Sequence, residues 1–512
     1  MNKPTSSVSH ALKKGGGKFF AVFAVAFVDR TAEKTQVMER EEAGTDLLNG
    51  QKKVEVSSEE PPRVSISGKS LLISFVSSLG FFSAGLVRGW SAPAIASIQG
   101  FNNYTDYTLP QGPLSREEIS WICSVAPMGA AIGSVMSSFL LHNYGRKVAL
   151  MVPSFIMILS FNILALAFYS GSVEQMILHV GITVPSGQIY ITECVEPSVR
   201  GLLGSLPAAS MALGIMICFM IGTGIPWHYL SFLCGAVPVI EFTLLAFMPE
   251  SPTYLLLKNR EDVAYKSLLW LRGNRQRHIV SKEFQKLKDD VQGILQEGRS
   301  GPPKKLHFSE LKKSQVYKPL FIVTMITVFQ QWNGVFRAIL FNLTIIFEAL
   351  TLPISERMAT ILIGVVQFVM TLGSVFIVDK AGRRVMLMTS GLTMALANAV
   401  LGATFYLQKN SETYNSTTSL EWMPLFSLML FIIGYSVGYA SIPYVILGEL
   451  LPNRLRGALG GVVALVPYAY SSFRQSTCVP VITKLADIDE ETHTSVDEDA
   501  DANYTPLRFE FT

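Results

Sequence analysis

The stretch "IPYVILGELLPNRLRG", residues 442–457, decides the fold because an earlier stretch, "IYITECVEPSVRG" at 189–201, has the same pattern. In each, an apolar segment ends at a glutamate, an arginine follows seven residues later, and a glycine comes directly after it. These residues are Glu193 and Arg200 in the first copy, and Glu449 and Arg456 in the second. A pattern that occurs twice in one chain indicates an internal repeat.

The composition is that of a membrane protein. Of the 512 residues, 49% are apolar and 16% are charged, and the mean hydropathy is +0.35. A spanning helix needs roughly 20 apolar residues, whereas barrel strands are about half as long and alternate. Long apolar blocks occupy 70–97, 119–141, 148–169, 202–224, 227–248, 320–347, 359–378, 385–407 and 423–447, with a weak block at 176–192 and a short one at 458–473. We therefore expect ten or eleven helical spans.

Several function classes find no support in the sequence. The five cysteines are scattered, and the seven histidines lack the spacing of metal ligands. The chain contains neither a Walker loop nor a nucleophile–base constellation. We therefore expect no enzymatic activity, no metal or other cofactor and no nucleic-acid partner. The lipid bilayer is the expected environment, and no obligate protein partner is inferred.

Lysine and arginine gather in alternate loops, and this asymmetry marks those loops as cytosolic. Cations follow the second, fourth, eighth and tenth spans and fill the long loop after the sixth. The intervening loops hold few cations, and two of them carry the glycosylation sequons of Asn103 and Asn415. These patterns predict a multi-pass protein of the cell membrane, with a cytosolic N-terminus and with glycans at Asn103 and Asn415.

The basic motifs run in the same order through both parts of the chain. "NYGRK" and "ECVEPSVRG" follow spans two and four, and "VDKAGRR" and "GELLPNRLRG" follow spans eight and ten. This order predicts two six-helix units in parallel orientation, as in carriers whose halves move around a central site. The expected parts are a disordered cytosolic tail (1–68), an N-terminal bundle (69–248), a basic cytosolic loop (249–318), a C-terminal bundle of four to five spans (319–473) and an acidic tail (474–512).

The ordered motifs "GRK", "YITE" with its later "RG", "PESP", "FQQWNG", "VDKAGRR" and "IPYVILGE" resemble those of the sugar porter family. This family of the major facilitator superfamily includes facilitated trehalose transporters and facilitative glucose transporters. The resemblance covers roughly residues 71–473. It implies an all-α integral membrane fold of two six-helix halves. It also implies facilitative transport of a sugar, trehalose or a hexose, by alternating access.

Charged residues at the cytosolic helix ends form a candidate gate. Arginine binds carboxylates bidentately. Partly exposed pairs contribute only about 0–1 kcal/mol each, which suits a contact that must open. The alternative is that these cations are ordinary cytosolic residues of a membrane protein. The candidate gating residues are Arg146, Lys147, Glu193, Arg200, Glu250, Asp379, Arg383, Arg384, Glu449 and Arg456.

Polar residues inside the spans are candidates for substrate binding. The resemblance implies that Gln330 and Gln331 hydrogen-bond sugar hydroxyls, with Asn333 close by in the sequence. Gln367 and Tyr444 stand where the family usually has Asn and Trp. Amides both donate and accept hydrogen bonds and therefore suit neutral polyols. The alternative is that these side chains join helices to one another.

The chain departs from the family pattern in spans one and seven. Phe336 replaces an Asn that would bind sugar, and Arg337 follows it. Span one carries Arg88 instead of the acid found in proton-coupled porters, which favours uniport over symport. If Arg88 and Arg337 both face the central site, the protein would carry an organic anion. Otherwise the two cations extend to the membrane surface or pair with Glu241.

The end of the chain also departs from the family. Residues 474–512 are acidic and contain no apolar block long enough to span the membrane. We therefore expect the twelfth helix of the family to be missing and transport to be weak. The alternatives are a transport-dead sugar sensor and a truncated gene product.

Overall fold

The structure is a computed structural model of the chain, and it describes residues 68–98, 114–170, 187–195, 200–273, 277–299, 314–332, 354–410, 422–450, 463 and 465–470. Within these ranges the secondary structure is helical, without strands. The helices are α2 (Gly68–Ile98), α3 (Arg116–Asn143), α4 (Arg146–Ser170), α6 (Gly187–Cys194), α7 (Arg200–Gly222), α8 (Trp227–Phe247), α9 (Pro252–Leu257), α10 (Glu261–Arg272), α11 (Arg277–Arg299), α13 (Ser314–Trp332), α15 (Glu356–Ala381), α16 (Arg383–Asn410), α17 (Met423–Val437) and α18 (Ile442–Leu450).

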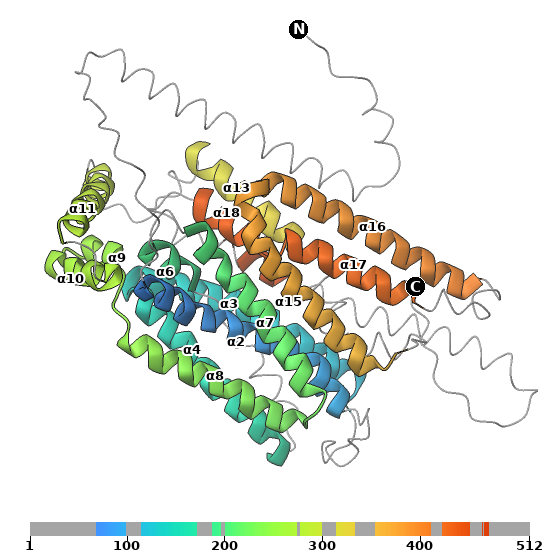
Figure 1. Cartoon of the computed structure of the whole chain (residues 1–512). Helices are drawn as coiled ribbons and strands as arrows, with labels where there is room; N and C mark the ends of the chain where they lie inside the picture. The colour runs from blue at the N-terminus through green and yellow to red at the C-terminus, as the bar shows by residue number, and fades with distance from the viewer. Residues whose placement is uncertain are drawn as a thin grey trace, which may run out of the picture.

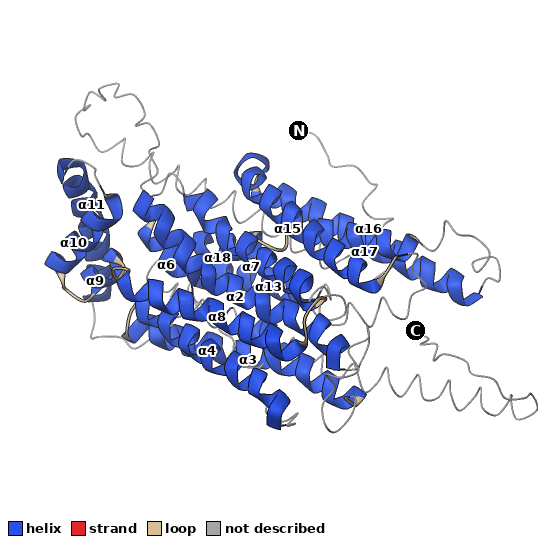
Figure 2. Cartoon of the chain, turned by 60° about the horizontal axis from the view of Figure 1, so that its bottom comes forward, coloured by secondary structure: helices blue, strands red, loops and turns tan. Residues whose placement is uncertain are grey.

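The long apolar helices run side by side in one bundle, and the helices α9, α10 and α11 gather at one end of it (Figures 1 and 2). In the first half, α2 packs against α7 and α8, and α4 packs against α8. In the second half, α17 packs against α15 and α16. The two halves meet where α15 packs on α7. The largest apolar core of the described residues is therefore shared by both halves, and its members include Phe219 of α7, Ile363 of α15 and Ile432 of α17.

The predicted all-α membrane fold is confirmed. Among the described residues, six helical segments are long and apolar enough to cross a membrane. They are Gly68–Ile98, Arg146–Ala167, Leu203–Gly222, Trp227–Phe247, Arg357–Val378 and Arg383–Thr404. The weak span at 176–192 is described only at its end, as α6, and the span at 320–347 only as far as Trp332. The expected absence of a twelfth helix lies outside the described residues.

Two glycines end corresponding helices in the two halves. Gly145, between α3 and α4, has φ +102°, and Gly382, between α15 and α16, has φ +81°. Glycine adopts this left-handed backbone without steric cost. Each glycine lies within a motif that the sequence repeats, "NYGRK" and "VDKAGRR". The same turn at the corresponding place in each half agrees with the internal repeat.

Two predicted segments differ from the structure. The single span predicted at 423–447 is two helices, because α17 ends at Val437 and α18 begins at Ile442. Gly438 lies too close to α16 for a side chain, and Pro443 lacks the N–H that a continuous helix would need. The segment predicted as a loop at 249–318 contains α9, α10 and α11. Helix α9 forms because Ser251 caps its N-terminus and Pro252 occupies its first position.

Candidate functional site

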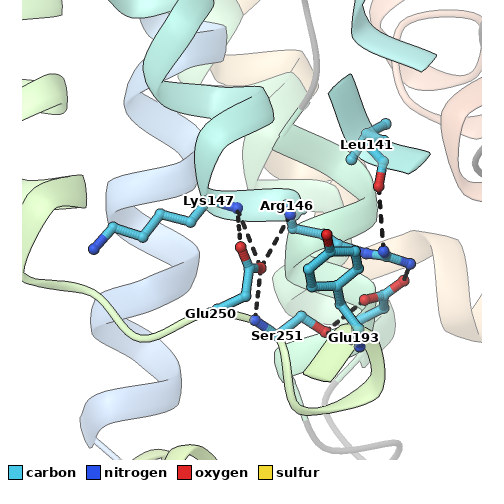
Figure 3. Close-up of polar contacts among 7 residues, drawn as sticks. Leu141, Arg146, Lys147, Glu193, Glu250 and Ser251 are labelled. Carbon is cyan, nitrogen blue, oxygen red and sulfur yellow. Dashed lines mark hydrogen bonds and ion pairs between the residues drawn. The ribbon is translucent and has the colours of Figure 1, made fainter. Parts of the chain in front are cut away.

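Charged and polar side chains gather at one end of the N-terminal bundle, where α3, α6 and α8 end and where α4 and α9 begin (Figure 3). Arg146 and Glu193 form an ion pair with a distance of 2.6 Å between Nη2 and Oε1. The other oxygen of Glu193 accepts a hydrogen bond of 2.6 Å from the Ser251 hydroxyl. Both charged side chains are largely buried, with 12% and 14% of their surfaces exposed. This pair is therefore more enclosed than the partly exposed pairs expected from the sequence.

Glu250 caps the N-terminus of α4 from a distant part of the chain. Its Oε1 accepts hydrogen bonds from the backbone N–H groups of Arg146 (3.0 Å), Lys147 (3.3 Å) and Ser251 (2.8 Å). The first N–H groups of a helix lack partners within the helix, and an anion there also interacts favourably with the helix dipole. Gly145 makes this approach possible, because a Cβ there would overlap the Glu250 carboxylate.

The surroundings of the Glu250 carboxyl shift its pKa by opposing effects. Burial raises the pKa of its carboxyl above the ordinary value, although the three backbone donors and Arg146 act in the opposite direction.

The hydroxyl of Tyr254 donates a hydrogen bond to the Asn143 carbonyl at 2.9 Å, and the centre of the Tyr254 ring lies 5.0 Å from the Arg146 guanidinium. The Tyr254 ring therefore covers one side of the cluster.

Arg272 attaches the helices α10 and α11 to this cluster. Its guanidinium donates to the Cys194 carbonyl at the end of α6 (3.1 Å) and to both carboxylate oxygens of Glu283 on α11 (2.6 and 3.0 Å). Only 4% of the Arg272 side chain is exposed. Sequence reasoning missed Arg272, because it lies among many other cations in the stretch 258–288. Sequence reasoning also missed Ser251, although this residue directly follows Glu250 in the "PESP" motif.

The structure locates only part of the predicted gate. Lys147 donates through Nζ to the Ala246 carbonyl at 2.7 Å, and Arg383 and Arg384 begin α16 in the second half. The contacts of Arg146, Glu193 and Glu250 described above stay within the N-terminal half. A gate between the two halves therefore stays a prediction. The side chains of Arg200, Asp379, Glu449 and Arg456 lie outside the described residues.

The two glutamines of span seven lie at the end of α13, inside the protein. The exposed fractions of Gln330 and Gln331 are 2% and 6%. The Nε2 of Gln330 donates a hydrogen bond of 2.6 Å to the backbone carbonyl of Tyr439, beside the break between α17 and α18. Gln367 on α15 is 1% exposed, and its Oε1 has no hydrogen-bond partner among the described residues.

Arg88 of α2 reaches toward the second half. Its guanidinium contacts the Met211 sulfur on α7 and the Tyr468 hydroxyl, the latter at 3.3 Å. Glu241 of α8 is 1% exposed, and a Cβ on Gly80 would lie 2.7 Å from its Oε1. Gly80 and Arg88 are eight residues apart, which is about 12 Å along the axis of α2. Glu241 therefore lies beside a different turn of α2 from the one that carries Arg88. The remaining candidates, Asn333, Arg337, Asn103, Asn415 and the side chain of Tyr444, lie outside the described residues.

A bundle of long apolar helices, with a positive-φ glycine between corresponding helices of each half, is the architecture of a multi-pass membrane protein with an internal repeat. The chain belongs to the sugar (and other) transporter family, whose model matches residues 75–488. Members of this family are transporters, and the chain is a multi-pass membrane protein.

Similar proteins carry the names of trehalose carriers. The facilitated trehalose transporter Tret1 of Bombyx mori is 31% identical over 81% of this chain and 77% of its own length. The protein of the same name from Drosophila yakuba is 32% identical over 80% of this chain. The chain spans less than half of the Drosophila yakuba protein, 45% of its length.

Solved structures show the same fold. The proton:xylose symporter XylE bound to 6-bromo-6-deoxy-D-glucose has a TM-score of 0.64 and 20% sequence identity, and the match covers 82% of this chain and 90% of that one. A partially occluded inward open conformation of XylE from E. coli has a TM-score of 0.59 and 19% identity, with coverage of 82% and 97%. At these identities the likeness concerns the fold alone.

Proposed function

We propose that the protein carries a sugar, trehalose or a hexose, across the cell membrane by facilitated alternating access. The observation that supports this most is the pair of buried amides, Gln330 and Gln331, on a helix of a core that both halves share. Amides can replace the water that a neutral polyol loses on binding, because they donate and accept hydrogen bonds. The names of the relatives favour trehalose among the sugars.

The other binding residues of the proposal surround this pair. Gln367 of α15 offers a buried amide oxygen that can accept from a sugar hydroxyl. Asn333 and Tyr444 belong to the proposed site because of the motifs around them. The proposed gate joins the cytosolic cluster of Arg146, Glu193 and Glu250 to the corresponding charged residues of the second half. These are Asp379, Arg383, Arg384, Glu449 and Arg456.

The test is uptake of labelled trehalose and glucose into liposomes that contain the purified protein. Losing a hydrogen bond between neutral groups costs about 0.5–1.5 kcal/mol, and each 1.4 kcal/mol corresponds to about tenfold in affinity. Gln331→Ala should therefore raise the KM for sugar several-fold. Gln285→Ala, which removes an exposed amide on α11, is the matched control and should leave KM unchanged. Equal sugar kinetics for both variants would remove Gln331 from the site.

A second candidate function is transport of an organic anion. The contact of Arg88 with Tyr468 supports it, because it places a guanidinium between α2 and a helical segment of the second half. Arg337 would supply the second cation. In the same liposomes, Arg88→Gln should abolish uptake of an organic anion and spare sugar uptake if this alternative is correct. Anion uptake that does not depend on Arg88 would exclude it.

The proposed orientation places the N-terminus in the cytosol and the sequons of Asn103 and Asn415 outside the cell. Removal of N-glycans should then increase the gel mobility of protein made in glycosylation-competent cells. Asn103→Gln combined with Asn415→Gln should show the faster mobility without enzyme treatment. A mobility that neither treatment changes would contradict this topology.

A further inference from the structure

The break between α17 and α18 leaves one backbone carbonyl without its helical partner. In a continuous α-helix the N–H of residue 443 would bond to the carbonyl of residue 439. Residue 443 is proline, which has no N–H. The carbonyl of Tyr439 therefore needs another donor, because an unpaired backbone group inside a membrane protein is costly.

Gln330 supplies that donor. Its Nε2 lies 2.6 Å from the Tyr439 oxygen, although 109 positions separate the two residues in the chain. Both residues are buried, with exposed fractions of 2% and 9%. Helix α13, which carries Gln330, also packs directly against α18. The side-chain amide thus takes the place of the N–H that Pro443 lacks.

The opposite side of the break rests on α16. A Cβ on Gly438 would lie 2.6 Å from the Ser390 Cβ and 2.7 Å from the Met386 carbonyl oxygen. The Ser390 hydroxyl donates to the carbonyl of Gly434 at 2.6 Å, at the last turn of α17. Residues 438–441, called here the hinge segment, are therefore held between α16 on one side and Gln330 on the other.

We propose that Gln330 is a positioning residue that caps the carbonyl exposed by Pro443 and so holds the hinge segment against α13. This inference rests on the proposed sugar transport, and it divides the work of the two glutamines. The bond to the Tyr439 carbonyl occupies one N–H of the Gln330 amide and fixes the orientation of that amide. Of the proposed pair, we therefore assign the main sugar contact to Gln331. Movement of α18 during alternating access then acts directly on the helix that carries the sugar-binding amide.

The experiment is a double-mutant cycle between Gln330→Met and Pro443→Ala. Methionine has nearly the length of glutamine but donates no hydrogen bond, and alanine at 443 restores a backbone N–H for Tyr439. Gln330→Met alone should lower the melting temperature of the purified carrier and reduce the maximal uptake rate by about tenfold, with KM nearly unchanged. In the Pro443→Ala background, most of both losses should disappear.

Other outcomes overturn the proposal. Equal losses in both backgrounds would show that the amide does not substitute for the missing N–H. A raised KM with an unchanged melting temperature would make Gln330 a sugar ligand instead. If Gln330→Met does not accumulate in the wild-type background, accumulation in the Pro443→Ala background is the supporting result, and failure in both overturns the proposal.

The control variant is Gln331→Met, whose effect should be the same in both backgrounds. Melting requires no sugar, so the melting cycle tests the hinge independently of transport. If the wild-type protein takes up no sugar while the cycle still shows rescue, the proposed function fails and the capping role of Gln330 stands.

Discussion

Glu250→Ala should strongly destabilise the folded carrier. The substitution leaves the backbone N–H groups of Arg146, Lys147 and Ser251 without their shared acceptor. These hydrogen bonds are partly buried. A fully buried donor left unpaired costs about 1–3 kcal/mol, so we expect a total loss of about 2–3 kcal/mol for the three. This is a large share of the stability of a protein. Thermal melting in detergent and the amount of protein at the cell surface measure the effect.

Glu250→Gln is the matched variant, because it keeps the length of the side chain and one acceptor oxygen. It should retain most of the stability that Glu250→Ala loses. A comparison across pH then tests the charge. Because burial raises the pKa of Glu250 in the folded protein, the folded state binds the proton more tightly than the unfolded state does.

The stabilisation from this proton is complete below the unfolded pKa, about 4.3 for a glutamate, and it is lost as pH rises through the folded pKa. Wild-type stability relative to Glu250→Gln should therefore fall as pH rises through this range. If the stability of the wild type relative to Glu250→Gln instead rises with pH, the backbone donors and Arg146 lower the pKa of Glu250 by more than burial raises it. Equal melting of the alanine and glutamine variants would contradict the capping role.

The sequence predicted much of the bundle because membrane spans leave a strong signal. The apolar blocks at 202–224 and 227–248 correspond to α7 (Arg200–Gly222) and α8 (Trp227–Phe247) within a few residues. The sequence could not predict the break at 438–441, because the residues on both sides are apolar. A hydropathy pattern does not show that a residue lacks its backbone N–H. Pro443 was the local signal, but a proline can also kink a helix without ending it.

The candidate site was predicted as a group of residues but not as a set of partners. Sequence spacing suggested that Glu193 and Arg200 act together, since they belong to one repeated motif. The described partners of the Glu193 carboxylate are Arg146 and Ser251, which lie at the starts of α4 and α9. Such pairs depend on how α4, α6 and α9 pack together, and spacing along the chain does not encode that packing.

Gly85→Ala should disrupt the contact between α2 and α7. A Cβ at Gly85 would lie 3.0 Å from the carbonyl carbon of Met211 and would overlap its oxygen. Gly214 of α7 meets α2 in the same way, because its Cβ would lie 3.1 Å from the Gly85 Cα. Small residues allow membrane helices to approach this closely. The obstacle is backbone, so no change of rotamer relieves the overlap and the helices must move apart.

The expected cost of Gly85→Ala is at the upper end of the range of about 1–3 kcal/mol for overpacking, or beyond it. The separation would also displace Arg88 from Met211, one turn further along α2. Gly373→Ala is the matched control, since a Cβ there meets nothing within 4 Å and alanine favours the helix. The melting temperature and the rate of sugar uptake should fall sharply for Gly85→Ala and stay unchanged for Gly373→Ala. If both variants melt and transport alike, α2 and α7 do not pack at backbone contact.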